Sequence, residues 1–337
     1  MPKSSSLLAA LSALVLPYSV LATEPSGESS FEVFQDPHFQ NGLILLDPAL
    51  GKLVPYGKTK ALNDSAEPSW KLAQWSSNFP LDESKYTTLP DGAISYVNQG
   101  KTVIMGPEKS DNADLTMGVT GLVEYESLGK NAARKEGEAW PHILVEQSIE
   151  NIPRLPELQS LTFRVEAKLK SVNHLKTPDY SVNLHSAIFL CYMTVQDVNP
   201  ESASYNQCVW FCIPIYDDRH RVPPEYMAKD VGKSDATGMF IYTLPGSVYT
   251  KDSAHDKKWI TLEKDLLPLI YDSIKMAWDR GYLKGNRQLS DYSIKTFAIG
   301  WEIPGTFDAE AQIRNLSLKA TTSKDLTSAA KYPPTTP

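Results

Sequence analysis

The nonapeptide LTFRVEAKL at residues 161–169 alternates apolar and polar side chains along its whole length. In a β-strand, its apolar odd-numbered residues would face one side and its Thr, Arg, Glu and Lys residues the other. Such alternation is typical of an antiparallel sheet that buries one face and exposes the other to water. The stretch therefore predicts an outer, convex sheet packed on a core.

Short β-favouring runs with turn residues between them recur on both sides of this stretch. They lie at residues 93–97, 102–105, 115–125, 142–149, 186–196, 208–216, 239–243, 296–303 and 309–318. One amphipathic helix is expected near residues 265–280, where apolar residues form a helical stripe that ends at Gly281. Because strands and helices do not alternate, the pattern predicts an all-β fold, an antiparallel β-sandwich.

The N-terminus has the pattern of a secretory signal peptide. Lys3 precedes an apolar run that ends at Ala22, and this run is too short and too mixed for a membrane span. We expect cleavage after Ala22, a periplasmic or secreted protein, and no membrane span after processing. Residues 23–30 are expected to form a flexible leader, residues 31–320 a single domain with an irregular N-terminal segment, and residues 321–337 a disordered tail.

Charge and cysteine content exclude some classes of partner and cross-link. The formal net charge of -7 disfavours binding to a nucleic-acid phosphate backbone. Cys208 and Cys212 would lie about 13 Å apart in one extended strand, beyond disulfide reach. With Cys191 on the opposite face, all three thiols are predicted to be free. No cofactor is implied.

The two most apolar runs, residues 186–196 and 208–218, are predicted to pair as a hairpin. The register that buries the apolar set places the following residues on the other face: Tyr192, Thr194, Gln196, Trp210, Tyr216 and Asp218. The strand near residues 296–304 adds Glu302 beside the small Ala298 and Gly300. Rings stack on the apolar faces of sugars and short polar groups bind hydroxyls, so this face suits a polysaccharide or oligosaccharide.

Hydrolysis of a glycoside needs two carboxyl groups, about 5 Å apart for retention and about 6.5–9.5 Å for inversion. Glu302 is the first candidate and Glu146 the second, because Glu146 shares a strand face with His142. The residues expected to bind substrate are Trp210, Tyr192, Tyr216, Gln196, Asp218 and His142. The alternative for either glutamate is a solvated or structurally hydrogen-bonded carboxylate.

A polysaccharide lyase is an alternative enzyme. Tyr216 with His142 or His185 would supply base and acid, and a uronate would be neutralised by Gln147, Arg219 or Arg221. Asp217 and Asp218 end an expected strand, where a charged turn is the simpler interpretation.

Metal binding has weaker support. His142 and Glu146 are four residues apart on a strand, which does not suit one zinc ion. Asp111, Asn112 and Asp114 offer oxygen atoms for calcium, although Asp/Asn-rich loops are ordinarily turns. Trp70 and Trp75 are either sugar platforms or, more simply, a cap on one end of the sandwich.

The segments Gly300-Trp301-Glu302-Ile303-Pro304 and residues 311–318 (AQIRNLSL) resemble the last two strands of jelly-roll proteins of the concanavalin A-like lectin and glucanase superfamily. The resemblance extends loosely over residues 93–318 and concerns the fold. It implies a jelly roll that holds glycans in its concave sheet. The Glu-x-Asp-x-x-Glu run of laminarinase-like hydrolases is missing, as are the Arg-Ser/Thr-Glu and Gln-Ile/Val-His motifs of alginate lyases, so no catalytic residue is carried over.

The function expected from the sequence is that of an exported carbohydrate-active protein that binds a polysaccharide in a concave groove and hydrolyses it. The alternatives are a non-catalytic glycan-binding or cell-envelope accessory protein, a lyase, and an assembly protein that docks a partner through its apolar hairpin.

Overall fold

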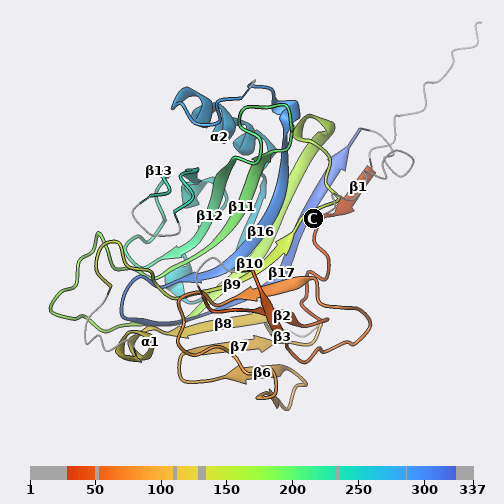
Figure 1. Cartoon of the computed structure of the whole chain (residues 1–337). Coiled ribbons are helices and arrows are strands. Elements are labelled where there is room, and N and C mark those ends of the chain that lie inside the picture. The colour runs from red at the N-terminus through yellow and green to blue at the C-terminus, as the bar shows by residue number, and fades with distance from the viewer. Residues whose placement is uncertain are drawn as a thin grey trace, which may run out of the picture.

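The computed structural model describes residues 29–49, 53–108, 112–127, 134–231, 236–285 and 287–323. Within these residues two β-sheets pack face to face, and helix α2 (Leu267–Asp279) lies beside one end of them (Figure 1). All strand pairings are antiparallel except two parallel ones, β2 (Leu43–Leu46) with β4 (Trp70–Ala73) and β12 (Cys208–Asp217) with β14 (Phe240–Thr243). The predicted β-sandwich is confirmed.

The eight-stranded sheet has the order β15-β10-β17-β8-β7-β6-β5, with β1 pairing against β17. Its strands are β1 (Ser29–Glu32), β5 (Thr87–Thr88), β6 (Ile94–Val97), β7 (Lys101–Met105), β8 (Leu115–Thr120), β10 (Leu158–His174), β15 (Ile260–Asp265) and β17 (Phe307–Thr322).

The nine-stranded sheet has the order β13-β14-β12-β11-β16-β9-β4-β2-β3. Its strands are β2 (Leu43–Leu46), β3 (Pro55–Lys58), β4 (Trp70–Ala73), β9 (His142–Ser148), β11 (Ile188–Asp197), β12 (Cys208–Asp217), β13 (Tyr226–Lys229), β14 (Phe240–Thr243) and β16 (Tyr292–Glu302).

The core lies between the sheets and follows the alternation of β10. All five apolar residues of its central stretch are buried, and Phe163 reaches Phe297 of the other sheet with ring centroids 5.9 Å apart. Burying each large apolar side chain contributes about 1.5–3 kcal/mol. On the opposite face, Glu166 pairs with Arg164 and Arg314 at 2.8 Å each. A one-residue slip would exchange these two faces, so the pattern fixes the register.

The predicted hairpin is β11 with β12, and its predicted core set is buried. A β-bulge between Phe189 and Leu190 then shifts the pairing, so that Phe189 lies opposite Tyr216. Tyr216 therefore faces the core and packs against Trp301, with centroids 5.9 Å apart. Its expected place on the polar face was wrong, because simple alternation does not anticipate a bulge. The three cysteines are free, as predicted.

The expected helix is α2 (Leu267–Asp279). A second helix, α1 (Gly121–Ser127), was not predicted; it divides the run at residues 115–125, which was expected to be one strand. A Cβ on Gly121 would lie 2.4 Å from the Phe307 carbonyl oxygen. Asp308 also accepts backbone hydrogen bonds from Gly121 and Leu122. A carboxylate distant in sequence thus caps the helix, which local propensity cannot reveal.

Regular structure runs slightly beyond the expected domain limits, from Ser29 in β1 to Thr322 in β17. The predicted signal peptide at residues 1–22 and nearly all of the predicted tail lie outside the described residues. In the described part of the chain, no helix combines the length and apolar character needed to cross a membrane.

Candidate functional site

The candidate site lies on the outer face of the nine-stranded sheet, which we define as the face turned away from the core. Directly paired residues share a face, so its side chains form rows across the strands. The first row is Asp217, Ile188, Glu302 and His142, and the second is Pro214, Leu190, Gly300, Leu144 and Ala73. The third is Cys212, Tyr192, Ala298, Glu146 and Lys71, and the fourth is Trp210, Thr194, Thr296 and Ser148.

Glu302, at the end of β16, is the most perturbed carboxyl of this face. Its side chain is 19% exposed, and Trp140 Nε1 donates a hydrogen bond to Oε2 at 3.2 Å. Burial raises the pKa of Glu302 to about 7, although the Trp140 hydrogen bond and the charge of Arg134 oppose this shift. Glu302 therefore carries a proton in a large fraction of molecules at neutral pH.

His142 lies beside Glu302, with its Nε2 atom 3.8 Å from Oε1. Its Nδ1 atom is 2.8 Å from the Trp140 carbonyl oxygen. A carbonyl only accepts hydrogen bonds, so Nδ1 carries the proton of the neutral ring and Nε2 keeps its lone pair toward Glu302. His142 and Glu302 therefore face each other within the first row.

Aromatic rings surround this pair. Trp140 stacks on His142 with centroids 5.5 Å apart, and the Arg134 guanidinium lies 4.5 Å from the Trp140 ring. Trp75 also approaches His142 edge-on, with ring centroids 6.0 Å apart. Trp75 also packs against a small apolar cluster formed by Leu46, Ala73 and Leu144.

A second pair of rings lies farther along the outer face. Tyr192 and Trp210 are partly buried and meet edge-on, with centroids 6.3 Å apart. Trp210 Nε1 donates to Thr237 Oγ1 at 3.1 Å, and Gln196 Nε2 donates to Asn206 Oδ1 at 3.0 Å. The face thus offers apolar rings with orienting polar groups both beside Glu302 and away from it.

Glu146 lies on the same face but is not brought next to Glu302. It is paired with Ala298 on one side and Lys71 on the other. Four residues at about 3.3 Å each place its row about 13 Å from that of Glu302, which exceeds the usual hydrolytic spacings. Burial raises the pKa of Glu146, whereas the charge of Lys71 lowers it.

Asp217 is the carboxylate that shares the first row with Glu302. It lies two strands away, which corresponds to about 10 Å between Cα atoms. Arg219 holds it through Nε–Oδ1 and Nη2–Oδ2 contacts of 2.8 and 2.7 Å. The adjacent Asp218 follows β12, and its Oδ1 accepts the Ala187 N–H at 2.8 Å. Asp218 therefore fastens the ends of β11 and β12 together.

The neighbouring strand β9 leaves no room for a side chain at Gly300. A Cβ there would lie 2.0 Å from the Ile143 carbonyl oxygen. The close approach of the β9 backbone explains the glycine, so its small size is not a sign of space kept for a ligand.

The residues suggested for a lyase are not brought together. Tyr216 is on the core side, and burial raises the pKa of its phenol well above the usual value. His185 Nδ1 accepts the Ser181 N–H at 2.9 Å, while Nε2 lies 2.7 Å from the Arg134 carbonyl oxygen. Gln147 binds the Gln35 backbone, and Arg221 binds Asp256.

The loop suggested for calcium is tied to other protein groups. Asp114 Oδ2 lies 3.0 Å from His38 Nδ1 and accepts the Asn315 N–H at 2.8 Å. Asn112 donates to Asp91 at 3.2 Å, and Asp111 lies outside the described residues. Among the residues that are described, no three His, Cys, Asp or Glu side chains are arranged to hold a metal ion.

Trp70 and Trp75 lie in different parts of the structure. Trp70 is fully buried in the core and donates to the Asp36 carbonyl oxygen at 2.8 Å, whereas Trp75 lies on the outer face. Sequence reasoning missed Trp140 and Arg134. The signal available was position: Trp140 stands directly before Pro141 and the first residue of β9, and site residues collect at strand ends.

Comparison with known proteins finds only distant similarity. No protein-family model and no curated protein matches the chain. Similar solved structures include a meso-active, thermostable cellulase derived from Cel12A of Rhodothermus marinus, at 12% identity over 74% of this chain and 99% of that chain, with a TM-score of 0.38. A family 12 xyloglucanase from Bacillus licheniformis shares 9% identity over 71% and 98%, with a TM-score of 0.38. A family 11 xylanase from Neocallimastix patriciarum shares 9% over 72% and 97%, with a TM-score of 0.34. These values concern the sandwich architecture alone and transfer no substrate or residue role.

Proposed function

We propose that this protein binds a polysaccharide or oligosaccharide on the outer face of its nine-stranded sheet and hydrolyses a glycosidic bond, with Glu302 as general acid. The observation that carries the proposal is the environment of the Glu302 carboxyl group and its raised pKa. Glu302 is partly buried beside Trp140 and His142 at the end of β16, and its pKa is raised to about 7. A carboxyl that holds its proton near neutrality can protonate a leaving oxygen.

The surroundings of Glu302 would orient both the acid and the sugar. Trp140 fixes one carboxyl oxygen and His142 faces the other, at 3.2 and 3.8 Å. Trp75, Tyr192 and Trp210 would stack on sugar rings. The second and fourth rows carry no charged side chain, which favours a neutral glycan over a uronate.

The first row of the outer face indicates which residue would supply the second carboxyl group. Asp217, about 10 Å from Glu302 between Cα atoms, would activate water from within the first row, a separation closer to that of inverting enzymes. Glu146, in the third row, would instead bind sugar hydroxyls. Burial of Tyr216 and engagement of both His185 nitrogens count against a lyase.

A non-catalytic glycan-binding protein is the second candidate. It is favoured by the distance of about 13 Å that the strand register puts between the rows of Glu146 and Glu302. The same rings would then bind the glycan without cleavage. Export to the periplasm or the medium is part of both proposals and rests on residues 1–22.

The test incubates the protein with a panel of neutral and uronic-acid polysaccharides while reducing ends and unsaturated products are followed together. Glu302→Gln, Asp217→Asn and Glu146→Gln are compared in the same assay. We expect new reducing ends without unsaturation, lost in Glu302→Gln and retained in Glu146→Gln. Unsaturated products would overturn the hydrolase proposal, and retardation on affinity gels without cleavage would favour the binding protein.

A further inference from the structure

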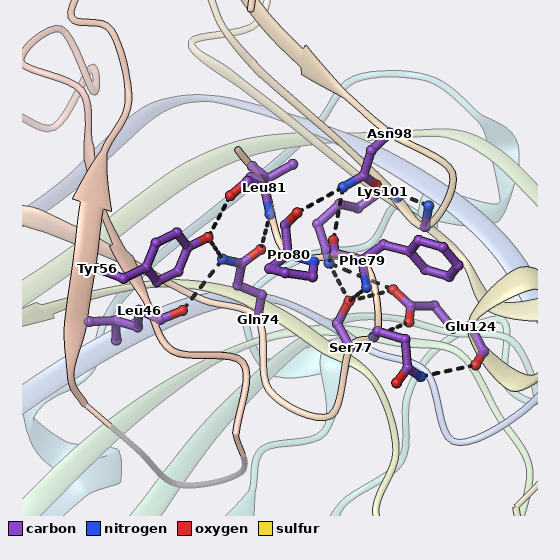
Figure 2. A network of polar contacts seen from close by, with 12 residues as sticks. Leu46, Tyr56, Gln74, Ser77, Phe79, Pro80, Leu81, Asn98, Lys101 and Glu124 are labelled. Carbon is purple, nitrogen blue, oxygen red and sulfur yellow. Dashed lines mark hydrogen bonds and ion pairs between the residues drawn. The ribbon is translucent and has the colours of Figure 1, made fainter. Parts of the chain in front are cut away.

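A buried polar network, drawn in Figure 2, joins β7 and α1 to the chain segment that follows Trp75. Its centre is Lys101 of β7, 2% exposed, and Glu124 of α1, fully buried, with Nζ 3.6 Å from Oε1. Burial lowers the pKa of Lys101 to about 8, and Glu124 opposes this shift. The pair therefore costs desolvation energy that its attraction must offset.

The pair holds the chain segment that follows Trp75. Ser77 Oγ donates to Glu124 Oε1 at 2.5 Å, and the Asn78 N–H donates to Oε2 at 2.8 Å. Lys101 Nζ donates to Ser77 Oγ and to the Phe79 carbonyl oxygen. Figure 2 shows these bonds converging on one short stretch of backbone.

A second anchor holds the residue that precedes Trp75. Gln74 is fully buried, and its amide donates to Tyr56 Oη at 2.5 Å and accepts the Leu81 N–H at 3.0 Å. Tyr56 Oη in turn donates to the Leu81 carbonyl oxygen at 2.7 Å. Trp75 thus lies between two buried anchors, and Ser76, next to it, adopts a left-handed conformation with φ of 57°.

Trp75 connects these two anchors to the candidate site. Its carbonyl oxygen accepts the His142 N–H at 2.9 Å, and its ring approaches the His142 ring. His142 in turn faces Glu302. A buried ion pair is weak evidence for stability, because apolar replacements are often neutral or stabilising, whereas fixing one geometry is its best-supported use.

We propose that Lys101, Glu124 and Ser77 are positioning residues that hold Trp75, and through its carbonyl His142, in place on the glycan-binding face. The role in glycan binding rests on the proposed function, whereas the mechanical link from Ser77 to His142 does not. Displacement of a positioned group by about 1 Å can cost about a hundredfold in rate.

The test compares Ser77→Ala with Ser202→Ala. Both serines are buried and donate to a buried carboxylate at 2.5 Å. Ser202 bonds to Asp197 at the opposite end of β11, so it serves as a matched control. The ligand is the polysaccharide that retards the wild-type protein on affinity gels. We expect Ser77→Ala to bind it about tenfold more weakly than wild type. Ser202→Ala should bind it as wild type does, although both variants should lose a similar amount of stability. Equal effects of the two variants would overturn the proposal.

A second readout needs no glycan and separates this proposal from the proposed function. Amide hydrogen exchange at His142 should speed up by about tenfold in Ser77→Ala and in Lys101→Met/Glu124→Leu, while amides of β11 keep wild-type rates. The double variant replaces the ion pair with apolar groups and should stay folded. Unchanged exchange at His142 in that folded variant would refute the positioning role, even if a substrate is found. If exchange at His142 is faster but the wild-type protein binds none of the polysaccharides tested, the mechanical link is upheld and only the proposed function is refuted.

Discussion

Glu124, which is fully buried, and Glu302, which is partly buried, both lie close to a basic side chain, yet their surroundings differ. Glu124 accepts hydrogen bonds on both oxygens and has the Lys101 ammonium 3.6 Å away. Glu302 receives a hydrogen bond from Trp140 and faces an imidazole nitrogen at 3.8 Å. The hydrogen bonds and the lysine partner of Glu124 make it an anchor, whereas burial with fewer partners raises the pKa of Glu302 to about 7.

The variant with the largest expected effect removes the acidic group of Glu302. Glu302→Gln keeps the shape of the side chain but cannot donate an acidic proton, so hydrolysis should fall by about 10²–10⁴-fold while glycan binding persists. Reducing-end assays and affinity gels measure the two effects separately. Full activity in Glu302→Gln would contradict the assigned role.

Removing one partner of the ion pair should have a large effect on stability, in addition to the loss of glycan binding that its positioning role predicts. Lys101→Met leaves Glu124 buried without its cation, which should lower the free energy of unfolding by about 3–5 kcal/mol. Urea denaturation measures this loss. The double variant Lys101→Met/Glu124→Leu should recover most of it, and failure to recover would mean that the two losses are independent.

The two groups should also respond to pH with opposite signs. The pKa of Glu302 is raised from 4.5 to about 7, so the folded state binds more protons in this window and stability falls as pH rises through it. The full difference corresponds to about 3 kcal/mol. The pKa of Lys101 is lowered from 10.5 to about 8, so stability from this group rises with pH between those values.

Denaturation curves measured across both pH windows check these signs. Glu302→Gln should reduce the slope between about pH 4.5 and 7 by more than Glu146→Gln does, because burial raises the pKa of both groups but Glu302 has the larger shift. The hydrolysis rate of the wild type should fall as pH rises through about 7, because the general acid loses its proton. A rate that increases through this range would rule out Glu302 as the acid.

The smallest predicted effect concerns the distant rings. Trp210→Ala removes one ring of the Tyr192–Trp210 pair, far from Glu302, and should weaken glycan binding by about fivefold without changing the pH profile. Isothermal titration with an oligosaccharide measures it. A changed pH profile would mean that the distant rings and the acid are coupled.

Much of the fold was predictable because burial imposes a period of two. The alternation in β10 and the core residues of β11 and β12 were read correctly, since a slip would have buried polar groups. The β-bulge that turns Tyr216 inward leaves no periodic signal. Helix α1 depends on the cap from Asp308, which is remote in the sequence.

The candidate site was predictable in kind but not in spacing. Glu302, His142, Tyr192 and Trp210 were assigned to one face, where the structure places them. The distance from Glu302 to Glu146 depends on which residue of β9 pairs with which residue of β16, and the sequence of each strand alone does not specify that pairing. The sequence analysis did not single out Lys101 or Glu124, because their contact arises only when the fold brings β7 and α1 together.

The pairing of β1 with β17 has a mechanical consequence. Ser29 lies opposite Thr322, and the strands run antiparallel from there. A force applied at these two residues would open the β1–β17 hydrogen bonds one after another, like a zipper, instead of shearing them all at once. We therefore expect β1 to detach at low force, before the sandwich itself yields, in a single-molecule pulling experiment.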